Sequence, residues 1–172
     1  MGEDLLTFNG ASIRGMVLAK IGGVKIISNA EVPTPMTRAD CEANKSKYGI
    51  NACNYESDYW AGAMKQCQDA GGRLPTEQEL ADIATALYGG KQGGGSFSAS
   101  DSMSYINCAG SIGSGVAIPE ALSGLGSSWY TLWSSGEGYA TYAYLRGFVS
   151  SGTTRGNGYR NSSGIRAVCV TN

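Results

Sequence analysis

The chain has 172 residues, a length that suits one domain with a hydrophobic core of its own. Its net charge of −1 and its sequence pI of about 5.4 leave no overall positive field to hold nucleic acid, so a nucleic-acid partner is not expected. Histidine is absent, which removes the commonest general base and metal ligand and leaves little support for a catalytic triad or a zinc hydrolase.

The first segment predicts a β-hairpin. Apolar residues recur through Ser12–Ile21 and Val24–Ser28, and the pair Gly22–Gly23 between them suits a tight turn. Pro33 and Pro35 then end the regular structure. No apolar run approaches the roughly 20 residues that span a bilayer. Attachment to a membrane or a pilus would therefore depend on an N-terminal segment missing from this sequence.

The cysteines are widely spaced, and they are Cys41, Cys53, Cys67, Cys108 and Cys169. None belongs to a CxxC or CxxH pair of the kind that a zinc site needs. Disulfide bonds are the better interpretation, and they indicate an exported protein. Cys41 and Cys53 bracket a polar stretch with little apolar content, which predicts a loop held by a local disulfide.

Two helices follow. Ser57 is a good N-cap for the first, which ends at Gly71–Gly72. Thr76 and Glu79 form a capping box at the start of the second helix, which ends near Tyr88. Apolar residues at helical spacing form the buried stripe of each. In the first helix they are Tyr59, Trp60, Ala63, Met64 and Cys67, and in the second they are Leu80, Ile83, Ala84 and Leu87.

Beyond the second helix the sequence becomes rich in glycine and serine. The stretch GGKQGGGSFSAS from Gly89 has few apolar groups to offset the entropy of ordering its glycines, which predicts a mobile surface loop. Strand-like pieces follow at Trp129–Ser134, Ala140–Val149 and Ile165–Val170. Two helices flanked by β segments from both ends of the chain predict an α+β fold with small antiparallel sheets.

Two motifs resemble the C-type lectin fold, in particular the prokaryotic branch related to formylglycine-generating enzymes. AGAMKQCQDAGGRLPTEQELADI is similar to its helix, Gly-Gly, Leu-Pro-Thr, helix signature, and LWSSGEG followed by SSGIRAVCV is similar to its C-terminal close. The resemblance covers residues 57–172, and residues 1–56, the hairpin and disulfide loop, would belong to the same domain. It implies a Cys67–Cys169 disulfide alongside Cys41–Cys53, with Cys108 unpaired.

The C-terminal segment also resembles the variable regions of proteins diversified by retroelements, in which adenines of asparagine codons are randomised. We expect a variable binding region over residues 134–166. Sixteen positions would read naturally from an asparagine-rich template, and they are the candidate ligand-binding residues: Gly136, Gly138, Tyr139, Thr141, Tyr142, Tyr144, Leu145, Gly147, Val149, Gly152, Thr154, Gly156, Gly158, Tyr159, Ser162 and Gly164. Arg155, Arg160 and Arg166 would belong to the fixed scaffold and pair with buried carboxylates or backbone carbonyls.

This pattern indicates recognition rather than chemistry. Tyrosine offers a large, stiff contact area while serine, glycine and asparagine offer adaptable hydrogen bonds, so we expect Tyr139, Tyr142, Tyr144 and Tyr159 to dominate binding of a protein or glycan. An undiversified binding domain with the same fold is an alternative interpretation. MTRADCEANKSKYGINACNYESDYWAGAMKQC also resembles the globular part of gut bacterial pilin-like proteins, so a structural pilin or surface subunit is a further alternative. Each places the protein outside the cell or on the surface of a bacterium or phage.

Enzymatic and metal-dependent functions find little support. The resemblance to formylglycine-generating enzymes would imply a pair of C-terminal cysteines, but only Cys169 is there, and Leu145–Val149 is the nearest equivalent of their RGGSW segment. The EPN, QPD and WND tripeptides of calcium-dependent lectins are absent, and Glu137 with Asn157 and Asn161 would hold Ca²⁺ weakly.

Two further patterns have simpler explanations. Residues 89–95 lack the order of a phosphate-binding loop. Glu77, Glu79 and Asp82 suit the start of a helix better than acid–base catalysis. We therefore expect no catalytic residue, cofactor or metal.

Overall fold

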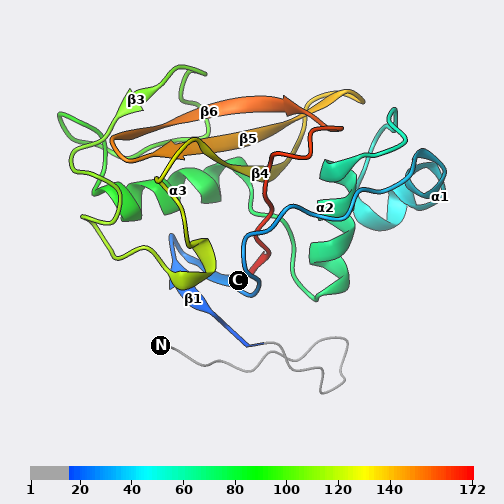
Figure 1. The fold of residues 1–172 in the computed structure, drawn as a ribbon, viewed down its shortest axis with the longest axis horizontal. Coiled ribbons are helices and arrows are strands. Elements are labelled where there is room, and N and C mark those ends of the chain that lie inside the picture. Colours follow the sequence, from blue (N-terminus) through cyan, green and yellow to red (C-terminus); the bar gives the residue numbers. More distant parts are fainter. Residues whose placement is uncertain (1–15) are drawn as a thin grey trace.

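A computed structural model describes residues 16–172 and shows an α+β fold with three α-helices and two small antiparallel sheets (Figure 1). The elements in chain order are β1 (Ala19–Ile21), β2 (Val24–Ile26), α1 (Arg38–Tyr48), α2 (Tyr59–Asp69), α3 (Glu77–Tyr88), β3 (Ile106–Asn107), a 3-10 turn (Glu120–Leu122), β4 (Tyr130–Glu137), β5 (Tyr142–Val149), β6 (Gly152–Tyr159) and β7 (Val170–Thr171). Helices α1 and α2 lie at one end of the molecule, and β3 with the glycine-rich loops lies at the other.

The smaller sheet joins the two ends of the described chain in the order β1-β2-β7. The predicted hairpin is confirmed over Ala19–Ile26, where Gly22 and Gly23 adopt φ of +60° and +82° in the turn. The part of the prediction before Met16 lies outside the described residues. Strand β2 pairs with β7, so the C-terminus lies beside the first strands (Figure 1).

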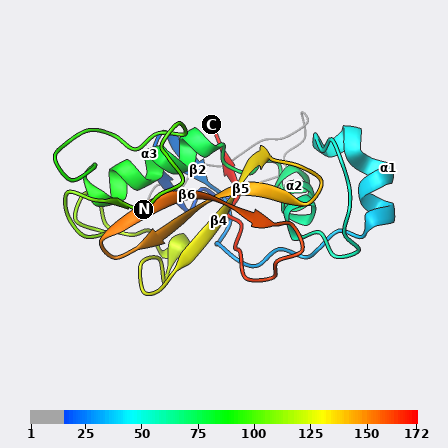
Figure 2. The same cartoon turned by 90° about the horizontal axis from the view of Figure 1, so that it is seen from above.

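The larger sheet has the order β3-β6-β5-β4, and α3 runs along one side of it (Figure 2). The predicted strands Trp129–Ser134 and Ala140–Val149 are seen as β4 and β5. Sequence reasoning did not find β6, which pairs with β5 along its whole length. The predicted strand Ile165–Val170 is reduced to isolated bridges and β7.

Helices α2 and α3 confirm the two predicted helices with small changes at their ends. Asp58 rather than Ser57 caps α2, because its carboxylate accepts the Ala61 N–H at 2.8 Å. The capping box of α3 is present, with the Thr76 hydroxyl accepting the Glu79 N–H and the Glu79 carboxylate accepting the Thr76 N–H. These local signals therefore located both helices within a residue or two.

Helix α1 corrects the prediction of an irregular loop between Cys41 and Cys53. The Thr37 hydroxyl accepts the Asp40 N–H at the start of the helix, and Gly49 closes it with φ of +71°. Only Cys41 and Tyr48 of this helix are buried. Two buried positions in eleven residues give too weak an apolar stripe to be recognised in the sequence.

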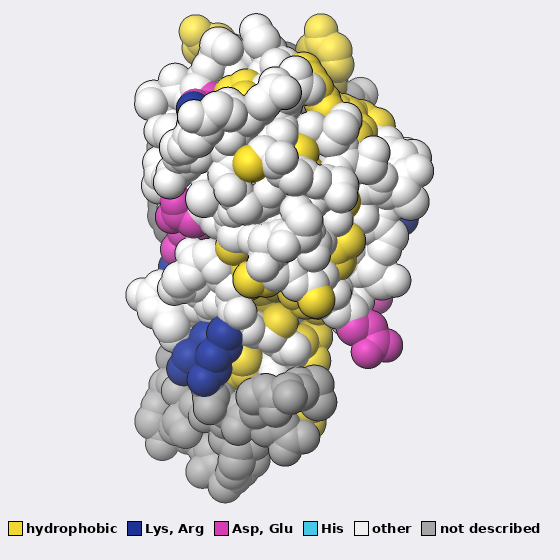
Figure 3. Space-filling model, turned by 90° about the vertical axis from the view of Figure 1, so that its left-hand side faces the viewer, with side chains coloured by type: hydrophobic (Ala, Val, Ile, Leu, Met, Phe, Trp, Pro, Cys, Tyr) yellow, Lys and Arg dark blue, Asp and Glu magenta, His cyan; other side chains and the backbone are white. Residues whose placement is uncertain are grey.

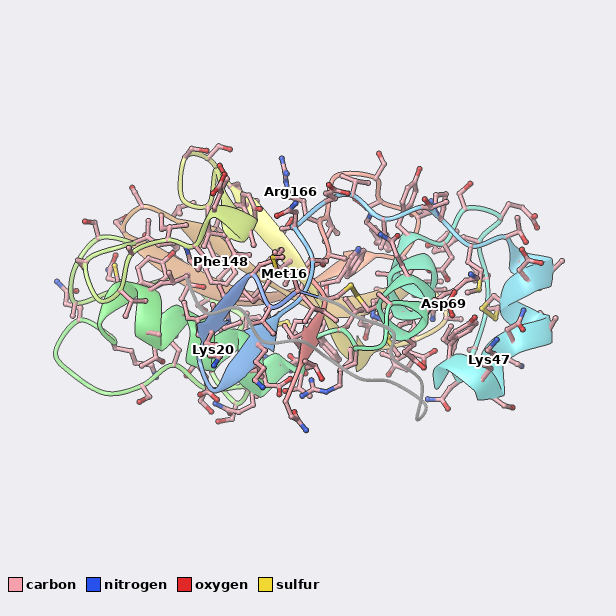
Figure 4. The ribbon with its side chains drawn as sticks, turned by 90° about the horizontal axis from the view of Figure 1, so that it is seen from below. Met16, Lys20, Lys47, Asp69, Phe148 and Arg166 are labelled. Carbon is pink, nitrogen blue, oxygen red and sulfur yellow. A yellow bond between two sulfur atoms is a disulfide. The ribbon has the colours of Figure 1, made fainter. Side chains whose placement is uncertain are left out.

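Side-chain contacts fasten α1 to α2. The Tyr48 hydroxyl donates to Asp69 at 3.0 Å, and the Gln68 amide donates to the Tyr48 carbonyl at 2.9 Å. Figure 4 shows Lys47 and Asp69 on these neighbouring helices. Lys65 and Tyr48 donate to Asp69 and hold its pKa below the ordinary value, against a smaller opposing effect of burial.

The glycine-rich loop after α3 lies on the surface but is anchored at several points. Phe97 is buried against Tyr88, with ring centroids 5.9 Å apart, and its N–H donates to the Thr85 hydroxyl. Asp101 accepts bonds from Lys91 and from the Ser98 N–H. This end of the molecule presents mainly uncharged side chains (Figure 3), so a charged ligand would find little to attract it there.

Both disulfides implied by the resemblance are present. Cys41–Cys53 links α1 to the following loop, and Cys67–Cys169 links α2 to the residue before β7. Cys108 is a free, buried thiol, and its burial raises its pKa. Among residues 16–172, none of the helices has the length and apolarity that a bilayer-spanning segment requires.

Candidate ligand-binding site

The pleat of β5 and β6 divides the sixteen candidate positions between two sides of the sheet. Tyr142 pairs directly with Tyr159, and Tyr144 pairs with Asn157, so these four side chains share the side on which α3 packs. The candidates on the opposite side are Leu145, Gly147, Val149, Gly152, Thr154, Gly156 and Gly158. The remaining candidates lie at or beyond the strand ends, and they are Gly136, Gly138, Tyr139, Thr141, Ser162 and Gly164.

The four predicted tyrosines meet at the end of the sheet that α3 leaves uncovered. The ring of Tyr142 makes edge contacts with Tyr139 and Tyr144, at centroid distances of 5.1 and 6.1 Å. Tyr139 and Tyr159 are each 67% exposed. Together with Asn157 these residues form what we call the tyrosine face. A shallow pocket of about 330 Å³ lies within it, lined by Tyr142, Asn157, Gly158 and Tyr159.

The tyrosine face carries no unpaired charge, because the cation beside it, Arg155, is paired with a carboxylate. The Arg155 guanidinium lies 5.0 Å from the centre of the Tyr144 ring and donates from Nε to Glu77 of α3 at 2.8 Å. Burial and the neighbouring Tyr144 and Tyr139 raise the pKa of Tyr142 above that of an ordinary tyrosine. The face therefore suits a neutral or weakly polar ligand surface.

Arg160 holds the framework behind the tyrosine face. It is fully buried, and its Nε and Nη2 lie 2.9 and 2.8 Å from the Asp58 carboxylate. Its Nη1 donates to Glu137 at 3.1 Å and to the Tyr139 carbonyl at 3.0 Å. One side chain thus ties the start of α2 to the end of β4 and to the loop that carries Tyr139.

The two carboxylates that Arg160 binds are held by backbone donors as well. Glu137 accepts the Asn51 and Ala52 N–H groups at 2.8 and 3.1 Å, which brings the chain between the first two cysteines under the β4–β5 loop. Burial raises the pKa of Asp58, while the Ala61 N–H and Arg160 act in the opposite direction. The predicted pairing of Arg160 with buried carboxylates is confirmed.

The other two scaffold arginines behave differently. Arg155 pairs with Glu77, a partly exposed carboxylate, as described above. The Arg166 guanidinium lies 4.9 Å from the centre of the Tyr130 ring. The Arg166 backbone forms an isolated parallel β-bridge with Leu132. Its side chain is exposed, so its contribution to the scaffold comes mainly from its backbone.

Several candidate positions face the protein rather than solvent. Leu145, Gly147 and Gly152 are buried. A Cβ on Gly147 would overlap the Trp129 ring, and one on Gly158 would overlap the Ile165 side chain. These positions therefore support the sheet from behind. A side chain at Gly147 or Gly158 would require Trp129 or Ile165 to move. At Gly152 a Cβ would meet the Ile106 backbone carbonyl oxygen, so close approach favours glycine there.

Sequence reasoning missed two residues at this surface. Asn157 was considered only as an oxygen ligand for calcium, although strand alternation would have placed it beside Tyr159 had β6 been recognised. Met103 is 44% exposed and lies with its sulfur 4.0 Å from the Asn157 amide nitrogen. No feature of the sequence indicates this contact, because it joins a loop residue to a strand residue 54 positions later in the chain.

The residues weighed for other chemistry have structural partners. Glu79 pairs with Arg73 and caps α3, and Glu77 pairs with Arg155. Cys169 is disulfide-bonded and so offers no thiolate. Within residues 16–172 no three His, Cys, Asp or Glu side chains gather in a way that could hold a metal ion.

Comparison with known proteins returned no matching family model, curated protein or solved structure.

Proposed function

We propose that this protein is an extracellular or surface-displayed binding protein with a C-type lectin-like fold, whose tyrosine face recognises a protein or glycan and is diversified by a retroelement. The observation that carries the proposal is the convergence of Tyr139, Tyr142, Tyr144 and Tyr159 on one exposed, neutral surface. Stiff aromatic side chains on a fixed support contribute contact area at low entropic cost.

The fold proposal draws support from the connections between the chain ends. Strand β2 pairs with β1 and with β7, and Cys67 of α2 bonds to Cys169, the residue before β7. Both features accord with the resemblance of residues 57–172 to C-type lectin-like domains. Two disulfides are compatible with an extracellular protein.

The genetic part of the proposal is tested by sequencing the flanks of the native gene. We expect a near-copy of the stretch that encodes Gly136–Val170, differing from it at adenines and lying next to a reverse transcriptase gene. Absence of such a copy would leave an undiversified binding domain or a structural pilin or surface subunit as the better interpretation.

The binding part is tested by replacing all four tyrosines with serine. Ligands are first recovered on the wild-type protein from a display library of short linear peptides and from a glycan array. We expect the variant to lose these ligands while its thermal unfolding midpoint changes little, because two of the four rings are 67% exposed. Tyr105→Ser, which removes a 44% exposed ring outside the face, is the control and should retain binding.

A large loss of stability in the four-tyrosine variant would instead mean that these rings are part of the core. The binding-face proposal would then fail, whatever the fate of the ligands. Retained ligand binding in a stable variant would equally contradict it.

A further inference from the structure

The outer edge of β6 is open beside the tyrosine face. Strand β3 pairs with β6 only at Gly152 and Thr153, and no other strand of the described chain pairs with that edge. Residues 154–159 are therefore paired with β5 on one side alone. A strand edge of this kind presents backbone groups to which another strand can bind.

The hydrogen-bond pattern identifies which backbone groups face outward. The Arg160 N–H donates to the Thr141 carbonyl at 3.0 Å, and stepping by two along antiparallel strands directs the backbone groups of Gly158 and Gly156 to β5. The alternate residues Arg155, Asn157 and Tyr159 direct theirs to the open edge. The contact of the Cys108 N–H with the Ser151 carbonyl shows the same alternation where β3 covers this edge.

Two of the outward carbonyls are already occupied. The Thr154 hydroxyl donates to the Arg155 carbonyl, and the Ser162 N–H donates to the Tyr159 carbonyl, each at 3.0 Å. The outward N–H groups of Arg155, Asn157 and Tyr159, and the carbonyl of Asn157, have no hydrogen-bond partner among the described residues, because β3 pairs with this edge only at Gly152 and Thr153 and β5 lies on the other edge. These groups repeat at every second residue, the spacing that an added strand presents.

The open edge is continuous with the tyrosine face. The side chains of Asn157 and Tyr159 lie on the same side of the sheet as Tyr142 and line the pocket there. A segment paired with β6 would therefore place alternate side chains over the tyrosines. Because Arg155 is paired with Glu77, that surface favours apolar or uncharged side chains.

We propose that the ligand of the tyrosine face is a protein, recognised through an extended segment that pairs with β6 along Arg155–Tyr159. The inference rests on the proposed binding function and specifies its partner class. Regularly spaced N–H and C=O groups match another polypeptide backbone better than the hydroxyls of a glycan. About five residues of the ligand, roughly 16 Å of strand, would span this edge.

The test replaces Asn157 with proline. Proline removes the outward N–H and fills the edge, but it leaves the β5 hydrogen bonds in place because they belong to the neighbouring residues. Linear peptides selected on the wild-type protein should bind N157P roughly tenfold or more weakly. Asn157→Ala keeps the N–H and loses the side chain, so we expect it to bind more tightly than N157P.

Amide hydrogen exchange provides a second measurement. In the free protein the amides of Arg155, Asn157 and Tyr159 should exchange fast, while those of Gly156 and Gly158 are protected by β5. Binding of a selected peptide should slow exchange at the first three. Unchanged exchange at these three amides in the complex would overturn strand pairing.

The other outcomes separate this inference from the proposed function. Equal peptide binding by wild type and N157P, or recovery of glycans with no peptide, would overturn strand pairing. If those ligands were still lost from the four-tyrosine variant, the binding face would stand. Selection that recovers no peptide would also overturn the inference.

Discussion

Replacing Arg160 with methionine is expected to lower the free energy of unfolding by about 3–5 kcal/mol, because it leaves buried carboxylates without a counter-charge. Asp58 is fully buried and Glu137 nearly so, and both are within 3.1 Å of the guanidinium. Methionine preserves much of the apolar stem, so the loss reports mainly on the charge. Urea unfolding of the two proteins measures it.

The matched control is Arg166→Met, which removes an exposed guanidinium from the same C-terminal segment. We expect a change within about 0.5 kcal/mol, as for most surface substitutions. Adding Asp58→Asn and Glu137→Gln to the Arg160 variant should restore part of the lost stability, since neither side chain is then charged. Equal losses from the two single arginine variants would contradict the role assigned to Arg160.

Removal of the Cys67–Cys169 disulfide by alanine substitution of both residues is expected to have a comparably large effect. Its sequence separation of 102 residues gives roughly 4–5 kcal/mol of stabilisation on the chain-entropy model. The Cys41–Cys53 disulfide closes a separation of only 12 residues, for which the same model gives about 3 kcal/mol. Unfolding of the two double variants measures the difference.

Cys108→Ala serves as the control for loss of a buried sulfur, because Cys108 forms no disulfide. Its effect should be smaller than that of either double variant. A larger loss on removing Cys41–Cys53 than on removing Cys67–Cys169 would show that loop length does not govern stabilisation here.

An element of the fold could be predicted from the sequence where the contacts that form it lie between residues close together in the chain. Helix α3 was located correctly because its capping box and apolar stripe lie within twelve consecutive residues. Strand β6 was missed because Gly152–Tyr159 contains three glycines and few residues that favour strands, and only its pairing with β5 makes it a strand.

The candidate site shows the same division. The composition of the C-terminal segment led us to expect four tyrosines in a binding site, and the structure brings those four together. Arg160 was expected to meet buried carboxylates, but Asp58 lies 102 positions earlier in the chain and no pattern links the two. The open edge of β6 depends on how far β3 extends, which is a property of the assembled sheet.

The pleat of β5 and β6 sets the size of the repertoire that diversification of this segment would produce. A substitution at Tyr142, Tyr144 or Tyr159 would alter what a ligand of the proposed face meets, whereas a side chain at Gly152 would meet the Ile106 backbone carbonyl oxygen. We expect variants of the second kind to fold less stably. Alternation along a strand would thus filter random change, so the variants that fold would differ mainly on the side of the tyrosine face.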